Sequence, residues 1–219
     1  MSNNRKTLVY GYPTINRMRI QSTKEQDAYK VWMTEKEAAE LLDYAENRGW
    51  KHHVVALLGL RCGLRATEIA GVTPNDIVED DNGYWLHIRG KDTTGEHGDN
   101  GKQRRVPLPT SVATTLYQYI GAEGVNDDSS IVGVVTDRVR QIVKELGVYA
   151  TQKSGNEDWE KISSHDLRRY YAQDLLVRKG ADVRAVMAAG GWDSYDAIEP
   201  YLREPTPENV SDEILGVLD

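Results

Sequence analysis

Cysteine is almost absent from this chain of 219 residues, which contains a single thiol, Cys62. One thiol excludes an internal disulfide and a cysteine-rich zinc site. Long hydrophobic runs are lacking too, because none approaches the roughly 20 apolar residues that a membrane-spanning helix needs. The opening residues, MSNNRKTLVYGYP, have no apolar stretch of the signal-peptide kind. We therefore expect a cytoplasmic protein with no membrane partner.

An excess of positive charge is also missing. The net charge is −7, from 27 Lys and Arg against 34 Asp and Glu, and this alone argues against a nucleic-acid-binding protein. The distribution is uneven, since residues 1–24 carry five basic residues and no acidic one, whereas residues 193–219 carry eight acidic residues and only Arg203. Arg outnumbers Lys by 16 to 11. This acidic, Arg-rich composition would suit a saline cytoplasm, so we expect a salt-loving archaeon or its virus as the source.

The balance of 39% hydrophobic and 28% charged residues is typical of a globular protein. Residues 1–30 are basic and polar with little apolar periodicity, so we predict an arm or linker there. One domain is expected over residues 31–205. Residues 206–219 combine acidic residues with an apolar stripe at helical spacing, which predicts a separate C-terminal helix.

Most of the expected domain has helical patterning. A capping box from Thr34 to Glu37 predicts the start of a helix that ends near Gly49. Two strands, 84–88 and 105–108, flank a polar, Gly-rich tip and predict a hairpin. Further helices are expected at 51–61, 66–71, 111–120, 137–146, 164–179, 183–189, 194–202 and 208–218. The predicted fold class is mainly α with a small antiparallel β-sheet.

Two sequence positions are typical of anion binding. His165 and Arg168 share one face in the first turn of a predicted helix, where free backbone N–H groups and the helix dipole favour an anion. Arg65 stands at another predicted helix start, where it could grip a phosphate with two N–H groups or pair with Glu68. Taken alone, the first pattern is more often a solvated first turn, and the second is more often a pair between Arg65 and Glu68.

Three further residue types complete the set of candidates. Lys91 and Lys102 flank the tip of the hairpin, where a lysine could donate a proton to a substrate or remain a solvated loop charge. Trp192 follows two glycines, and Tyr201 lies near the end of the next predicted helix. A tyrosine, with its free pKa of about 10, becomes a useful nucleophile where cations stabilise the phenolate.

The order of these residues along the chain resembles that of the tyrosine recombinase, or phage integrase, family. The resemblance covers residues 34–202 and rests on the segments TEKEAAELLDYA, LLGLRCGLRATEIAGV, RGKDTTGEHGDNGKQRRVPL, SSHDLRRYYAQDLL and GGWDSYDAIEPYL. It implies that residues 31–205 form a catalytic domain like that of the tyrosine recombinases. The implied activity is site-specific recombination of double-stranded DNA through a 3′-phosphotyrosyl intermediate.

The resemblance also implies a role for each candidate. Arg65 and Arg168 would bind the non-bridging oxygens of the scissile phosphate, and His165 would hold the phosphate and assist proton movement. Lys91 would protonate the leaving 5′-oxygen, and Tyr201 would be the nucleophile. Because the phosphotyrosyl ester conserves the bond energy, the family needs no metal, ATP or other cofactor.

Several positions depart from the family pattern. Trp192 stands where most members have His, and an indole N–H can only donate a hydrogen bond. Pro200 should bend the chain directly before Tyr201, whereas Tyr195 lies earlier in the helix and is the weaker nucleophile candidate. Lys102 remains an alternative to Lys91. About 30 residues replace the family's N-terminal DNA-clamping domain, so we expect either a minimal protein or a fragment.

The family's arrangement suggests further partners. The helix at 206–219 would dock on its own core or, as we favour, on a neighbouring subunit, linking a tetramer on DNA. The expected location is the nucleoid, or the host cytoplasm if the protein is viral. A catalytically silent DNA-binding accessory protein and a type IB topoisomerase-like enzyme are the alternative functions.

Overall fold

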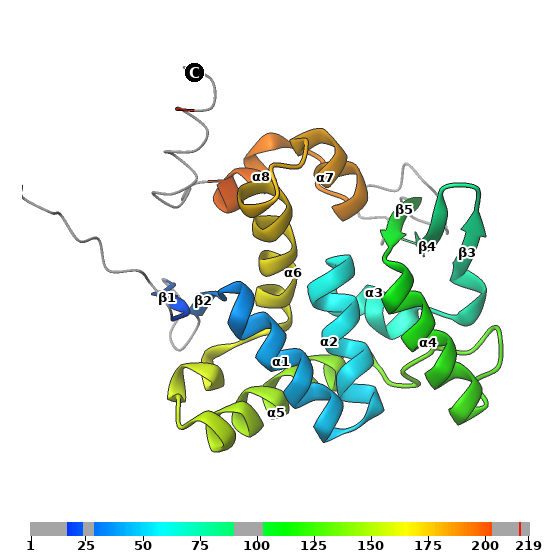
Figure 1. Cartoon of the computed structure of the whole chain (residues 1–219), viewed down its shortest axis with the longest axis horizontal. Helices are drawn as coiled ribbons and strands as arrows, with labels where there is room; N and C mark the ends of the chain where they lie inside the picture. Colours follow the sequence, from blue (N-terminus) through cyan, green and yellow to red (C-terminus); the bar gives the residue numbers. More distant parts are fainter. Residues whose placement is uncertain (1–16, 24–28, 90–102, 203–214, 216–219) are drawn as a thin grey trace, which may run out of the picture.

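The computed structural model describes residues 17–23, 29–89, 103–202 and 215 (Figure 1). Helices dominate this part of the chain, as predicted. They are α1 (Glu35–Arg48), α2 (Trp50–Cys62), α3 (Ala66–Gly71), α4 (Thr110–Glu123), α5 (Thr136–Ser154), α6 (Ser164–Gln173), α7 (Val183–Gly190) and α8 (Tyr195–Leu202), with short helical turns η1 (Pro74–Asp76), η3 (Glu157–Lys161) and η4 (Asp174–Arg178). None of the described helices is long and apolar enough to cross a membrane.

Local sequence signals set the ends of several helices. The capping box at the start of α1 is confirmed, since Thr34 Oγ1 accepts from the Glu37 N–H and Glu37 accepts from the Thr34 N–H. α2 ends as predicted at Gly63, whose φ of 64° is left-handed. A side chain at this position would also meet the Tyr171 ring at 2.3 Å. Only glycine therefore fits the turn that leads into Arg65 and α3.

Two predicted helices differ from the structure. α5 extends to Ser154, eight residues beyond the expected end. The helix expected at 164–179 runs without a break to Arg178, but its last turn, η4, is π-helical rather than α-helical after Gln173. The expected helix at 208–218 falls almost wholly outside the described residues.

The predicted hairpin is confirmed as β4 (Gly83–Arg89) paired with β5 (Gln103–Leu108). A strand that the pattern did not indicate, β3 (Ile77–Asp80), pairs with β4 to give a three-stranded antiparallel sheet. β3 has only four residues, which is too short for alternation to distinguish it from a loop. The tip between β4 and β5 lies outside the described residues.

Part of the expected N-terminal arm is structured. β1 (Arg19–Ser22) pairs with β2 (Tyr29–Trp32) in a second antiparallel sheet, and Met18 is buried. The Val31 N–H donates to Asp166 Oδ1 at 2.9 Å, and this bond fixes the small sheet to the start of α6. The chain thus joins the domain before residue 31, the start that the sequence predicted.

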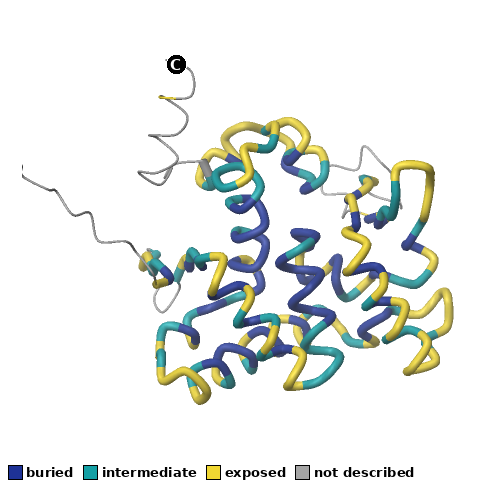
Figure 2. Tube along the Cα trace, in the orientation of Figure 1, coloured by how far each residue is buried: buried dark blue, intermediate teal, exposed yellow. Residues whose placement is uncertain are grey.

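Apolar side chains are buried in two separate groups. The main core is built by α1, α2, α5 and the sheet β3–β5, with Leu58 and Ile142 among its members. The C-terminal cluster contains Tyr171, Ala172, Val186, Trp192 and Ile198. Figure 1 shows α7 and α8 together at one end of α6, and Figure 2 shows that α2 and α6 carry much of the buried chain. α6 is the element that connects the two groups.

Candidate phosphate-binding and nucleophile site

Arg65 is the N-cap residue of α3, directly after the turn at Gly63. Its guanidinium donates to Glu68 Oε1 at 2.9 Å and to the Gly191 carbonyl at 3.0 Å, while its backbone N–H donates to Glu68 Oε2 at 2.7 Å. The side chain remains 43% exposed. Pairing with Glu68, considered above as an alternative to phosphate binding, therefore occurs, but it leaves the guanidinium accessible to a ligand.

Glu68 also holds a second arginine, which the sequence reading missed. Arg104 on β5 donates to both carboxylate oxygens of Glu68, at 2.7 and 2.9 Å, and its Nε donates to the Ala189 carbonyl at 2.8 Å. Both side chains are buried. Burial acts to raise the pKa of Glu68, but the hydrogen bonds and charges of Arg104 and Arg65 outweigh it and lower the pKa. Glu68 is therefore a buried carboxylate shared by two arginines.

Arg168 lies in the first turn of α6 and is buried. It donates to the Gly63 carbonyl at 2.6 Å and to the Gly190 carbonyl at 2.7 Å. Burial, followed by the repulsion from Arg65, lowers the pKa of Arg168 to about 10. The residue remains charged at neutral pH, and the cost of burying that charge favours an anionic ligand beside it.

Trp192 stands between Arg168 and Tyr201. The Arg168 guanidinium lies 3.9 Å from the centroid of the indole, and the Tyr201 ring packs edge-on against the indole at 5.5 Å between centroids. The electrostatic influence of Tyr201 reaches both Arg168 and Arg169. The tyrosine predicted as nucleophile thus lies beside the cationic end of α6.

Tyr195, the weaker nucleophile candidate, faces a different environment. It is 51% exposed, and its hydroxyl accepts from Arg184 Nε at 3.4 Å. Pro200 is accommodated inside α8, which continues to Leu202. A proline in the sixth position of this helix lacks the N–H that would bond to the first turn, so it removes one hydrogen bond without ending the helix.

His165 is exposed at the start of α6, yet it belongs to the same electrostatic unit. Partial burial of the ring lowers its pKa, and the positive charges of Arg169, Arg140, Arg168 and Arg65 lower it further. Its ring is therefore neutral near pH 7 and able to accept a proton. An anion among these arginines would reverse part of the shift.

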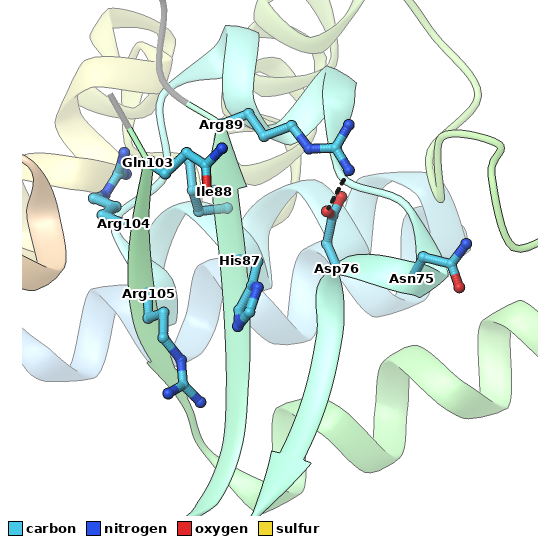
Figure 3. A pocket seen from close by; sticks show the side chains of 8 residues that line it. All are labelled: Asn75, Asp76, His87, Ile88, Arg89, Gln103, Arg104 and Arg105. Carbon is cyan, nitrogen blue, oxygen red and sulfur yellow. Dashed lines mark ion pairs between the residues drawn. The ribbon is translucent and has the colours of Figure 1, made fainter. Parts of the chain in front are cut away.

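The predicted proton donor lies outside the described residues, as Lys91 and Lys102 both do. The strands that lead to them border a groove of about 610 Å³ on the three-stranded sheet, lined by Asn75, Asp76, His87, Ile88, Arg89, Gln103, Arg104 and Arg105. Figure 3 shows these side chains, with Arg89 directed at Asp76. Arg104 lines the groove and bonds Glu68, so the sheet that bears the lysine loop adjoins the arginine site.

The arrangement is suited to the chemistry of a phosphate ester. Arg65 and Arg168 provide fixed N–H donors, and such donors stabilise the charge that builds up on phosphate oxygens in the transition state. Within the described ranges, no group of three His, Cys, Asp or Glu side chains is placed to hold a metal ion. The cations available at this site are arginines.

Comparison with known proteins places these residues in a known context. The phage integrase family model matches residues 31–206. Tyrosine recombinase XerA of Pyrococcus furiosus is 27% identical over 195 residues, which cover 84% of this chain and 61% of that protein. Tyrosine recombinase XerC of Caldanaerobacter subterraneus is 25% identical over 205 residues, covering 87% and 54%. The chain thus spans little more than half the length of these relatives.

Solved structures show the same fold. A crystal structure of XerA recombinase matches with a TM-score of 0.66 and 19% identity, covering 84% of this chain and 64% of that one. The Tn1549 transposon integrase in complex with transposon right-end DNA matches with a TM-score of 0.62 and 14% identity, covering 89% and 67%. The catalytic domain of bacteriophage HP1 integrase gives 0.57 and 14%, covering 84% and 92%. The predicted fold class is confirmed.

Proposed function

Since the chain belongs to the phage integrase family, we propose that it is a site-specific recombinase, which cleaves and rejoins double-stranded DNA through a 3′-phosphotyrosyl intermediate. One observation carries this proposal. Trp192 contacts both Arg168 and Tyr201, so the proposed nucleophile and a buried arginine belong to one packed unit. The named relatives, XerA and XerC, are tyrosine recombinases, which favours this activity over a topoisomerase-like one.

In the proposed cleavage step, the Tyr201 hydroxyl oxygen attacks the scissile phosphorus and the bond to the 5′-oxygen breaks. The phosphate remains on the tyrosine as a 3′-phosphodiester. Arg65 and Arg168 bind its non-bridging oxygens. They do so with the guanidinium N–H groups that are not already bonded to Glu68 or to the glycine carbonyls described above. A 5′-hydroxyl from the partner strand then attacks the same phosphorus and releases Tyr201, so no external energy source enters the balance.

Two protons move in this step. In this proposal neutral His165 accepts the tyrosine proton, supported by its lowered pKa in the free protein, which would rise when a phosphate joins the arginines. Lys91 gives a proton to the leaving 5′-oxygen, with Lys102 as the alternative. Trp192 cannot act as a base, because its indole N–H only donates. In this proposal Trp192 packs between Arg168 and Tyr201 and holds the two side chains near each other.

The partners are also proposed. Double-stranded DNA is the substrate, in keeping with neighbours such as the transposon integrase and XerH, which are described in complex with DNA. We further propose that the protein forms a tetramer on DNA, in which residues 206–219 dock on a neighbouring subunit. Its proposed role is in a mobile element, and its proposed location is the nucleoid. The acidic, Arg-rich composition is what supports an archaeal or viral source.

A covalent-trapping assay tests the activity. The protein is incubated with nicked duplexes made from the genomic flanks of its gene, at low and at molar salt, and the products are separated on denaturing gels. We expect a protein–DNA adduct that Tyr201→Phe abolishes and that Tyr195→Phe, the matched control, retains. DNA binding without any adduct would instead indicate a silent accessory protein. Relaxation of supercoiled DNA by a monomer would indicate a topoisomerase-like enzyme.

The same assay identifies the proton donor. A 5′-bridging sulfur in place of oxygen makes a leaving group that needs no proton. Lys91→Ala should slow cleavage of normal DNA by about 10²- to 10⁴-fold, the usual contribution of a general acid, and the sulfur substrate should restore the rate. If Lys102→Ala shows this pattern and Lys91→Ala does not, the assignment passes to Lys102.

A further inference from the structure

Three consecutive carbonyls at the end of α7 each accept a hydrogen bond from a different arginine. Ala189 accepts from Arg104, Gly190 from Arg168 and Gly191 from Arg65. Carbonyls in the last turn of a helix have no partner within the helix and carry its negative dipole end. The three arginines come from β5, α6 and the start of α3. The C-terminal end of α7 is therefore hydrogen-bonded to three separate elements of the domain.

Arg104 differs from the other two arginines in how it is held. Its side chain is only 8% exposed, against 43% for Arg65. Its N–H groups are directed at Glu68 and Ala189, and a side chain added at Gly191 would touch it at 3.1 Å. Figure 3 shows Arg104 and its neighbour Arg105 on opposite sides of β5, as strand geometry requires. Although Arg104 borders the groove on the sheet, its guanidinium is thus held by protein groups.

We propose that Arg104 is a positioning residue for strand cleavage, which holds Glu68, and through it Arg65, at a fixed distance from the end of α7. This inference rests on the proposed function. Arg104 donates to both carboxylate oxygens of Glu68, so this carboxylate is shared and the Arg65 side chain pairs with only one of its oxygens. Without Arg104, the buried carboxylate would satisfy its charge by drawing the Arg65 guanidinium onto itself, away from the scissile phosphate.

If Arg104 has this role, replacing it should slow cleavage, and the loss of rate should depend on the negative charge of the scissile phosphate. A displacement of a catalytic group by about 1 Å can cost roughly 100-fold in rate. Arg104→Gln should therefore slow adduct formation on normal DNA by roughly that factor, with DNA affinity within about twofold of the wild type. Arg104→Lys, which can reach one carboxylate oxygen but cannot bridge both and Ala189, should recover part of the rate.

Modified DNA distinguishes this role from general damage to the fold. A methylphosphonate at the scissile position replaces one charged oxygen with a methyl group, so its cleavage depends less on Arg65. The Arg104→Gln defect should shrink on the methylphosphonate and persist on DNA with the 5′-bridging sulfur. Arg138→Gln is the matched control, because Arg138 also donates two hydrogen bonds to one glutamate, Glu145, but on the exposed face of α5. It should cleave all three substrates at the wild-type rate.

The wild-type protein is tested first on normal DNA, because its result separates the proposed function from the role of Arg104. No adduct from the wild-type protein would contradict the proposed function, and the positioning role with it. If the wild type forms the adduct, an Arg104→Gln protein of normal activity overturns the inference alone. An equal defect on all three substrates, or restoration by the 5′-bridging sulfur, also overturns it, since these results indicate general misfolding or a role through the hairpin lysine.

Discussion

The main core and the C-terminal cluster differ in size and in how they are joined. The main core draws on most of the helices and the three-stranded sheet, whereas the C-terminal cluster has five buried residues. Several links between them are polar, since Arg65, Arg104 and Arg168 hydrogen-bond the carbonyls that end α7. We call these bonds the arginine–carbonyl seam. Arg65 and Arg168, which we propose bind the phosphate, lie on one side of it, and Tyr201 lies on the other.

The two apolar groups should also differ in how readily they open. Hydrogen bonds contribute about 0.5–1.5 kcal/mol each, and segments with few buried apolar contacts open more readily than a large core. We therefore expect the segment that contains α7 and α8 to open more readily than the main core. In the free protein Tyr201 lies against Trp192, and Trp192 in turn contacts Arg168.

The largest effect on cleavage is expected at Arg168, which belongs both to the arginine–carbonyl seam and to the proposed phosphate site. Arg168→Ala removes a positioned donor from the transition state, which typically costs about 3–4 kcal/mol, or 10²- to 10³-fold in rate. It also leaves the Gly63 and Gly190 carbonyls without that partner. Single-turnover adduct formation should fall by this factor. Arg168→Lys keeps the charge but loses the planar fork, so it is the matched variant. Normal cleavage by Arg168→Ala would defeat the assignment of this residue.

A pair of identical substitutions tests whether the two apolar groups unfold separately. Ile142 in the main core and Ile198 in the C-terminal cluster are both fully buried. Ile142→Ala should lower the free energy of global unfolding by about 2–5 kcal/mol, the usual cost of such a core truncation. Ile198→Ala should lower the global value less and instead speed amide hydrogen exchange in α7 and α8. Equal losses in urea unfolding would show that the two groups form one cooperative unit.

The smallest effect concerns pH. Because the folded pKa of His165 is lowered, the unfolded chain binds a proton at higher pH than the folded one. Unfolding free energy should therefore fall as pH drops below about 6.5, the pKa of an unperturbed histidine, and should not change above it on account of this residue. His52 and His53 are shifted in the same direction. His165→Gln should make the urea midpoint decrease less as the pH is lowered, without removing the decrease. If the decrease is the same in His165→Gln as in the wild type, His165 does not contribute to it.

The sequence predicted the elements that local signals define. Thr34 and Glu37 start α1, and Gly63 ends α2, because caps and left-handed turns depend on a few neighbouring residues. The hairpin was predicted from alternation on both sides of a polar tip. The strands β1, β2 and β3 were missed, since four residues carry too little periodicity. The change from α-helical to π-helical geometry after Gln173 had no local signal either.

The candidate site was predicted as an order of residues along the chain, and its family resemblance is confirmed over 31–206. Sequence alone determined which residue types are present: two arginines, a histidine, a tryptophan and a tyrosine with the spacing of the family. It also showed that Arg65 could pair with Glu68, three residues on.

Only the tertiary structure decided that Glu68 is shared with Arg104, which is 36 residues away in the chain, and that three arginines meet at one helix end. Such contacts depend on where β5 and α7 pack relative to α3, and no local pattern encodes that distance. The physical reason is that a buried carboxylate and the free carbonyls of a helix terminus both require donors, while the fold determines which side chains can reach them.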